Sequence, residues 1–190
     1  MKETPNAEAP RTIELTVEPG PQTVISTTSI AVAGPDSGAD VALVEGAAQR
    51  ERVKNEWSLG PGQPFTQSGW DSAKDGGLRT LRQRRYPTAR IANSRAEVDA
   101  DKPQAALSVD YDTGPAFRFG PLRIEGSERY DPEGARRLAR LPTGSVNSEA
   151  RMLDAQQRLA RSGYYDAVFL TLDTDGTDPA AVPVTAQVRE

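Results

Sequence analysis

The stretch that decides the fold is Phe117-Arg118-Phe119-Gly120-Pro121-Leu122-Arg123-Ile124-Glu125-Gly126, which follows the pair Gly114-Pro115. Its alternation of apolar and polar residues predicts a β-strand. The same order occurs earlier in the chain, where Gly20-Pro21 precedes the alternating residues Val24–Ala33. Two copies of one pattern predict two similar structural units.

The likeness between the copies continues beyond the first strand. Leu59-Gly60-Pro61-Gly62 corresponds to Leu141-Pro142-Thr143-Gly144, and both copies close on alternating residues, Ala106–Asp110 and Val182–Val188. The copies are about 80–90 residues apart, which is longer than one repeat of a solenoid and suits a small domain. We therefore expect two domains in tandem.

Two helical segments lie between the first strand and the closing strands of each copy. In the second copy, Asp131 before Pro132 predicts a helix start, and Gly163 predicts a left-handed residue at a helix end. In the first copy, Ser68 with Asp71 resembles a capping box. One face of the helix that follows it is predicted to be buried, and it consists of Trp70, Ala73, Gly77 and Leu81.

Two further strands follow the helices in each copy. They are predicted at Ala89–Val98 and Ala105–Asp110, and again at Asp166–Asp173 and Val182–Arg189. Each unit therefore reads strand, helix, helix, strand, strand. The predicted fold class is α+β, with a three-stranded mixed sheet covered by two helices on one face.

Four segments are predicted along the chain. Residues 1–10 are polar and contain prolines, and we expect them to be disordered. Residues 11–21 match the end of the first unit, Ala105–Pro115, and are interpreted as the last strand of a preceding domain that was cut away. Residues 22–113 and 114–190 are the two domains. A start in mid-pattern without a signal peptide indicates a piece of a longer protein.

The composition removes much of the chemistry that enzymes use. The 190 residues include no histidine and no cysteine, so neither a Ser-His-Asp triad nor a thiolate nucleophile can be built. The usual zinc ligands are missing as well. The net charge of −4 gives no basic footprint for nucleic acid. We therefore expect no catalytic, cofactor-binding or metal-binding residues, and a protein that is not an enzyme.

The repeated pattern resembles the POTRA domain, the polypeptide-transport-associated module that precedes the outer-membrane β-barrel in the BamA/TamA insertase superfamily. The resemblance rests on Phe117–Gly126, the Gly144 turn, the segment Leu159–Tyr165 and the closing strand Val182–Arg189. The sequence departs from the family in one detail, because Tyr165 stands where Phe is more frequent.

The linkers of the chain are similar to those of one branch of this superfamily. Asp112–Gly120 is similar to the joint between domains in TamA-type proteins, and so is the leading Val17–Pro21. The resemblance implies that residues 22–113 match the second POTRA domain and residues 114–190 the third.

The implied function is recognition and positioning of polypeptides. The resemblance implies a periplasmic scaffold of an assembly factor for outer-membrane proteins and autotransporters, tethered to the outer membrane through a C-terminal β-barrel. The implied partners are unfolded outer-membrane proteins and autotransporters, a TamB-like inner-membrane partner and a membrane surface, but no nucleic acid. Client binding is expected to occur partly by addition of a strand to an open sheet edge.

The family's topology places the strand after the helices at a sheet edge. In the second domain this candidate edge is apolar on both faces, and we expect it to bind polypeptides more readily than the other edge. It consists of Val168, Phe169, Leu170, Thr171 and Leu172. In the first domain the candidate edge is polar and basic, with Arg90, Ala92 and Ser94 as its candidate residues. The alternative is that these side chains only pack beneath the helices.

Three other features allow a functional and a structural interpretation. Asp173–Asp178 resembles the start of a calcium loop, but Val184 occupies the position of the bidentate glutamate, which favours a hairpin turn. Trp57 and Trp70 are either a binding platform or core residues. Four arginines form either an anionic-lipid patch or a favourable set of charges at a helix C-terminus: Arg79, Arg82, Arg84 and Arg85.

Two further functions stay open at this point. One is a POTRA-like partner-binding module of a secretion pore or of a cell-division protein. The other is an enzyme or nucleic-acid-binding protein on an α+β scaffold, which the composition disfavours.

Overall fold

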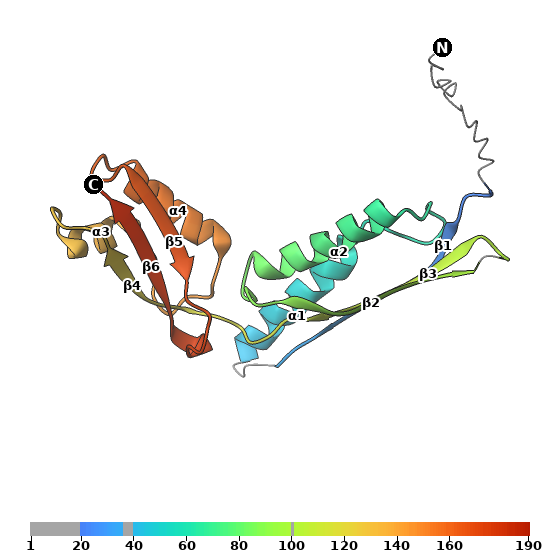
Figure 1. Ribbon diagram of the computed structural model, residues 1–190. Helices are drawn as coiled ribbons and strands as arrows, with labels where there is room; N and C mark the ends of the chain where they lie inside the picture. Colours follow the sequence, from blue (N-terminus) through green and yellow to red (C-terminus); the bar gives the residue numbers. More distant parts are fainter. Residues whose placement is uncertain (1–19, 36–39, 100) are drawn as a thin grey trace, which may run out of the picture.

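The computed structural model of the protein describes residues 20–35, 40–99 and 101–190. The predictions for residues 1–10 and for most of residues 11–21 therefore lie outside the described residues. The described chain forms two units that follow one another, each a sheet with two helices on one face (Figure 1).

The first domain contains three strands and two helices in the predicted order: β1 (Val24–Ala33), α1 (Asp40–Asn55), α2 (Gln67–Arg82), β2 (Arg90–Asp99) and β3 (Gln104–Asp112). The second domain repeats this order and adds a short 3-10 helix, η1: β4 (Phe119–Glu125), α3 (Pro132–Ala139), α4 (Glu149–Ala160), β5 (Ala167–Leu172), η1 (Pro179–Ala181) and β6 (Val182–Arg189).

The last strand of each domain lies in the middle of its sheet. The strand orders are β1-β3-β2 and β4-β6-β5. The central strand is parallel to the first strand and antiparallel to the strand after the helices. The prediction of an α+β fold with a three-stranded mixed sheet is confirmed, and so is the prediction that β2 and β5 are edge strands.

Alternation along the central strands explains how each sheet buries one face. Every second residue of a strand points to the same face. The inward residues of β3 are at most 2% exposed, and they are Ala105, Leu107, Val109 and Tyr111. The inward residues of β6 are also buried, and they are Val182, Val184, Ala186 and Val188. Each domain has its own hydrophobic core between sheet and helices.

The predicted inward face of α2 is confirmed, since Trp70, Ala73, Gly77 and Leu81 are all buried. The predicted capping box at Ser68 is wrong, because the helix begins earlier, at Gln67. Thr66 is the N-cap, and its Oγ1 accepts a hydrogen bond of 3.1 Å from the Gly69 N–H. Its extended backbone (φ −136°, ψ 146°) is the geometry that an N-cap requires.

The two tryptophans belong to the core of the first domain. Trp70 is 4% exposed, Trp57 packs against the same cluster, and the two rings meet edge to face at 6.0 Å. The acidic segment before β6 is a turn in which Asp178 caps η1 by accepting from the Ala180 N–H. In the part of the chain that the structure describes, no helix has the length and apolar character needed to cross a bilayer.

The loop between the two helices closes part of one sheet edge in both domains. In the first domain Ile25 donates to the Gln63 carbonyl (2.8 Å) and accepts from Gly62 N–H (2.7 Å). In the second, Phe119 makes the same two bonds with Ser145 (2.9 Å) and Gly144. Both glycines have the positive φ that this turn requires. The loops therefore cover the beginnings of β1 and β4, and the rest of each of these strands remains an edge of its sheet, opposite the edges β2 and β5.

Candidate functional site

Strand β5 presents one row of backbone groups to β6 and the other row outward. Asp173 N–H donates to the Pro183 carbonyl of the central strand at 3.1 Å. Because backbone groups of an antiparallel strand alternate in direction, Leu170 and its neighbours two residues away direct theirs to the open side. The Leu170 N–H confirms this direction, because its hydrogen-bond partner is a side chain of α4 and not β6.

That partner is Gln156. Its Oε1 accepts a hydrogen bond of 3.3 Å from the Leu170 N–H. The bond is long for an amide pair and its acceptor is a flexible, half-buried side chain. An incoming backbone carbonyl could take its place at little energetic cost. Gln156 therefore gives the edge a replaceable cap at one position.

A groove of about 410 Å³ runs between α4, β5 and the end of the first domain. Its apolar lining consists of Met152, Leu153, Leu170, Leu172 and Pro87. Arg82 and Glu149 bring one charge of each sign to the groove. Leu153 is 51% exposed, so the lining is accessible to an apolar side chain from outside.

The five predicted residues of β5 divide between the two faces of the sheet. Val168 is buried in the core, while Leu170 and Leu172 are half-buried and line the groove. Phe169 is 62% exposed on the opposite face, where exposed Thr171 lies two residues further along the strand. The interpretation that these residues pack beneath the helices therefore holds for Val168 and in part for Leu170 and Leu172, which pack against the core with one side, but not for Phe169 and Thr171.

The edge of the first domain differs in chemistry. Arg90, Ala92 and Ser94 are all exposed on β2. Arg90 pairs with Asp112 of β3 at 2.8 Å, and Arg95 pairs with Glu97 along the same strand at 2.8 Å. Charged side chains on an edge disfavour unspecific pairing. The structure therefore leaves β5 as the apolar edge of the two.

The two domains meet through backbone hydrogen bonds at the end of α2. Arg85 N–H donates to the Asn147 carbonyl (2.9 Å), and the Arg85 carbonyl accepts from the Phe117 N–H (2.8 Å). The Gln83 carbonyl accepts from the Glu149 N–H, the first of α4 (2.9 Å). Arg84 and Ser148 form an antiparallel bridge between these bonds. The joint fixes the first domain beside the groove.

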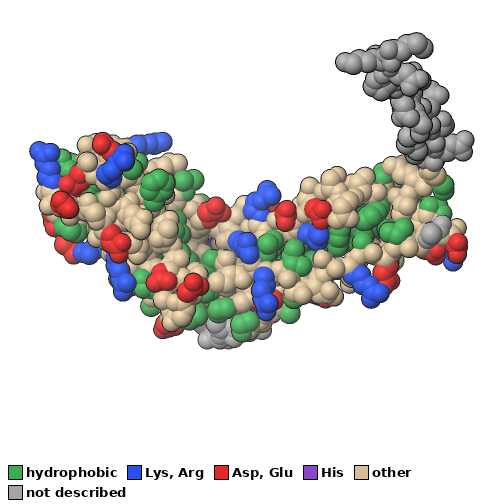
Figure 2. All heavy atoms as spheres, in the orientation of Figure 1, with side chains coloured by type: hydrophobic (Ala, Val, Ile, Leu, Met, Phe, Trp, Pro, Cys, Tyr) green, Lys and Arg blue, Asp and Glu red, His purple; other side chains and the backbone are tan. Residues whose placement is uncertain are grey.

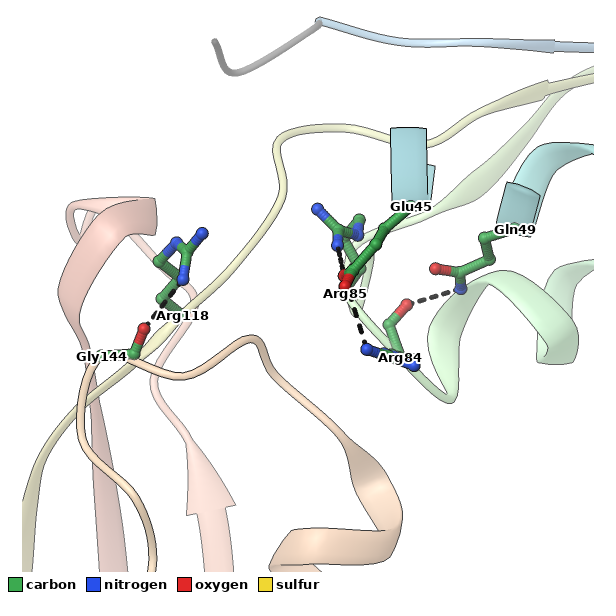
Figure 3. A network of polar contacts seen from close by, with 6 residues as sticks. All are labelled: Glu45, Gln49, Arg84, Arg85, Arg118 and Gly144. Atoms are coloured by element: carbon green, nitrogen blue, oxygen red, sulfur yellow. Dashed lines mark hydrogen bonds and ion pairs between the residues drawn. The ribbon is translucent and has the colours of Figure 1, made fainter. Parts of the chain in front are cut away.

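Arg85 is held by both its backbone and its side chain. It has a left-handed backbone (φ 69°) and is 2% exposed. Its Nη2 pairs with Glu45 of α1 at 2.6 Å, while Gln49 of α1 donates to the Arg84 carbonyl at 2.7 Å (Figure 3). On the other side of the joint Arg118 donates to the Gly144 carbonyl at 2.9 Å. Helix α1 therefore holds in place the segment after α2 that makes the bonds between the domains.

Three of the four arginines of the predicted patch make contacts within the protein, and these are Arg82, Arg84 and Arg85. Arg82 Nε donates to the Ala89 carbonyl at 2.8 Å, and both Arg84 and Arg85 contact Glu45. Over the face shown in Figure 2, charged side chains of both signs are interspersed. This arrangement favours the interpretation that these arginines serve the fold and the joint.

A carboxylate marks the exit from the first domain into the linker. Asp112 accepts a hydrogen bond from the Gly114 N–H (3.0 Å) and pairs with Arg90. Both hydrogen bonds lower the pKa of the Asp112 carboxyl, and the bond from Gly114 has the larger effect. Gly114 itself has φ 62°, a conformation that suits glycine at this turn.

Sequence reasoning missed the backbone bonds between the two domains and the cap on strand β5. Arg85, Asn147 and Gln156 are polar residues with no motif around them, and their roles depend on pairings between distant segments. One signal was present: Arg85 follows the second helix of its domain as Gly163 does in the second domain, and both have a positive φ. An arginine at a position that favours glycine indicates a constraint.

The comparisons with known proteins agree with this geometry. The family model for POTRA, described as "Surface antigen variable number repeat", matches residues 117–190. The chain is similar in structure to BamA POTRA3-5 of Haemophilus influenzae, with a TM-score of 0.62 and 22% identity over 90% of this chain and 63% of that one.

Two other solved structures share the fold. BamA from Haemophilus ducreyi lacking POTRA domains 1-3 matches with a TM-score of 0.63 and 17% identity, over 87% of this chain and 29% of that one. The N-terminal domain of Omp85 from Thermosynechococcus elongatus matches with a TM-score of 0.51 and 14% identity, over 90% of this chain and 63% of that one. The chain thus spans less than two thirds of each of these structures. Residues 117–190 thus match the POTRA family model, and Val24–Asp112 repeat the fold of this segment in front of it.

Proposed function

We propose that the protein is a polypeptide-binding scaffold whose two domains, residues 22–113 and 114–190, present sheet edges to extended chains. The observation that carries this proposal is the open, apolar β5 edge beside a groove. The outward N–H and C=O groups of Leu170 and Leu172 would pair with a client backbone, and the groove would accept one of its apolar side chains. Main-chain pairing makes little demand on client sequence.

We further propose the setting that the family resemblance implies. The chain would be the periplasmic part of a TamA-like assembly factor, held at the outer membrane by a barrel. Its clients would be unfolded outer-membrane proteins or autotransporters, and a TamB-like protein would be its inner-membrane partner. The similarity of the linker Asp112–Gly120 to the joints of TamA-type proteins supports this choice over a secretion pore or cell-division protein.

The proposed function is tested by capture of a defined peptide. The probe is a synthetic peptide of about ten residues with alternating apolar and polar side chains, which is the length of a membrane-spanning β-strand. A photocrosslinking amino acid replaces Phe169, whose exposed ring lies beside the open edge. We expect crosslinking to this peptide, and weaker crosslinking to a shuffled peptide without alternation.

A proline variant then separates strand addition from simple hydrophobic contact. Leu170→Pro removes an outward N–H and leaves the β5–β6 hydrogen bonds in place, since edge strands tolerate proline on their open side. Capture should fall while the thermal unfolding midpoint stays close to that of the parent. Unchanged capture by a folded Leu170→Pro variant would falsify strand addition at β5.

A further inference from the structure

The second domain contacts the first domain through one surface, and the first domain has a corresponding surface of its own. In the second domain Asn147 N–H donates to the Phe117 carbonyl at 2.9 Å, which sets the strand entry against the helix–helix loop. In the first domain Phe65 N–H donates to the Thr23 carbonyl at 2.8 Å. The two local geometries therefore correspond bond for bond.

The correspondence extends to all three atoms that hold the joint. In the second domain these atoms are the Phe117 N–H, the Asn147 carbonyl and the Glu149 N–H. Their counterparts are the Thr23 N–H, the Phe65 carbonyl and the Gln67 N–H. Thr66 and Ser148, which precede α2 and α4, are the matching N-caps.

The counterpart atoms have no such partners within the described residues. No hydrogen bond to the Thr23 N–H, the Phe65 carbonyl or the Gln67 N–H is seen there. Thr66 and Gln67 are exposed, and Phe65 is half-buried where Asn147 is 3% exposed. Among the described residues, the same surface is thus covered in the second domain and open in the first.

The sequence before this surface also repeats. Gly20-Pro21 precedes Thr23 as Gly114-Pro115 precedes Phe117, at the same spacing. The linker that leads from the first domain into the second therefore has a copy that leads into the first domain. The linker would place a domain that precedes Gly20 against the open surface, just as the linker at Gly114 places the first domain against the second.

We propose that Thr23 and Gln63–Gln67 form a docking surface for a preceding domain of the same fold. The left-handed residue after that domain's second helix would insert between Thr23 and Phe65, as Arg85 inserts between Phe117 and Asn147. Phe65 would supply an apolar contact where Asn147 supplies a polar one. The inference rests on the shared fold and does not depend on client binding.

A first test uses the chain as it is. Amide hydrogen exchange measured by NMR should show fast exchange at Thr23 and Gln67 and protection at Phe117 and Glu149. Protection of Thr23 and Gln67 comparable with that of Phe117 and Glu149 would mean that the chain already occupies its own surface. That result would overturn the proposal.

A second test adds a domain in front of the surface. In a duplicated chain, residues 1–113 are followed directly by residues 20–190, so Gly20-Pro21 forms the new linker. The chain has no cysteine, so an Arg84→Cys change in the front copy and a Thr66→Cys change in the second copy give one defined pair. Two residues paired in an antiparallel β-bridge have Cα atoms roughly 4.5–5.5 Å apart, and this distance suits a disulfide.

The expected result is rapid oxidation of this pair. The reference is Arg84→Cys with Ser148→Cys in the original chain, which occupies the observed bridge. The control is Arg84→Cys in the front copy with Ser72→Cys, an exposed position on α2 of the second copy. The test pair should oxidise about tenfold faster than the control pair. A fixed contact gives the two thiols a higher effective concentration than a flexible tether does. Equal rates for test and control pairs would overturn the proposal.

Discussion

Arg85 shows how one residue can set the relation between two domains. A left-handed backbone is unfavourable for a side chain with a Cβ atom, so the surrounding contacts must hold it there. Arg85 has these contacts, since its N–H and C=O both bond across the joint and its guanidinium reaches Glu45. Its buried charge therefore ties helix α1 to the interface.

The first prediction concerns this ion pair. Glu45→Gln should lower the free energy of unfolding by roughly 1–3 kcal/mol, since it weakens a hydrogen bond to a buried charged group. The matched control is Glu51→Gln on the same helix, whose pair with Lys54 is exposed (2.8 Å). The control should change the free energy by less than about 1 kcal/mol. Chemical denaturation of both variants measures the difference, and equal effects would contradict the prediction.

The second prediction concerns Asp112 and acid. Its folded-state pKa is lowered by the Gly114 N–H and by Arg90. A lowered pKa contributes stability that is fully present above the unfolded value of about 3.9 and is lost as the pH falls through the folded value. Asp112→Asn should therefore be less stable than the parent at neutral pH, with the gap narrowing in acid. A gap that stays constant down to the acid transition would contradict this assignment.

At the scale of the element, α2 contains two adjacent glycines with opposite surroundings. A Cβ on Gly77 would clash with the Tyr111 hydroxyl and would lie 3.2 Å from Val53. The same atom on Gly76 would meet nothing within 4 Å. Tyr111 cannot easily move aside, because it is 1% exposed and its hydroxyl donates to the Lys74 carbonyl at 2.9 Å.

The third prediction uses this contrast. Gly76→Ala should stabilise the protein by about 0.5–1 kcal/mol through helix propensity. Gly77→Ala gains the same propensity but forces the packed Tyr111 to shift, and overpacking costs about 1–3 kcal/mol. The second variant should therefore be neutral to destabilised. Thermal unfolding of the two variants checks the order, and equal midpoints would contradict it.

The fourth prediction concerns the cap on strand β5. Gln156→Ala removes the acceptor of the Leu170 N–H, so this amide should exchange with solvent faster than in the parent. Gln157→Ala is the matched control, since the neighbouring side chain is exposed. Amide exchange measured by NMR distinguishes the two. Unchanged exchange at Leu170 in the Gln156 variant would show that the cap does not protect the edge.

The order of the elements could be predicted from sequence because it depends on local periodicity. The alternation in Phe119–Glu125 and the helical spacing of the α2 face each indicate burial without reference to other segments. The joint could not be predicted in this way. Its bonds join Gln83 and Arg85 to residues more than 30 positions away, through backbone atoms that every residue carries. Gln156 could not be predicted either, because its role depends on how helix α4 lies against strand β5.

At the scale of the whole molecule, the joint makes the two domains one elongated unit. The linker offers few free torsions, since Thr113 N–H donates to the Ala33 carbonyl (2.8 Å) and Phe117 is bonded to Arg85. Only Gly114 to Ala116 lie between these fixed residues. The angle between the domains should therefore have one narrow distribution.

The fifth prediction tests this rigidity with a substitution that suits the helix. Proline is favoured at the first position of a helix, so Glu149→Pro should preserve α4 while it removes the bond to the Gln83 carbonyl. Gln67→Pro, at the first position of α2, is the matched control. Spin labels on cysteines introduced in each domain should report a broader distance distribution for Glu149→Pro only. Identical distributions in both variants would show that this bond does not fix the angle.

The parallel pairing of first and central strands has a mechanical consequence. Each domain is entered at the start of its first strand and left at the end of its central strand, and these two strands are neighbours that run in the same direction. Tension between the two ends of a domain would slide the strands along each other, so all bonds of the ladder would share the load. Such a chain resists pulling along its length far better than peeling at its edges. Strand β5 lies outside this path, so a client could attach and leave there while the molecule bears tension.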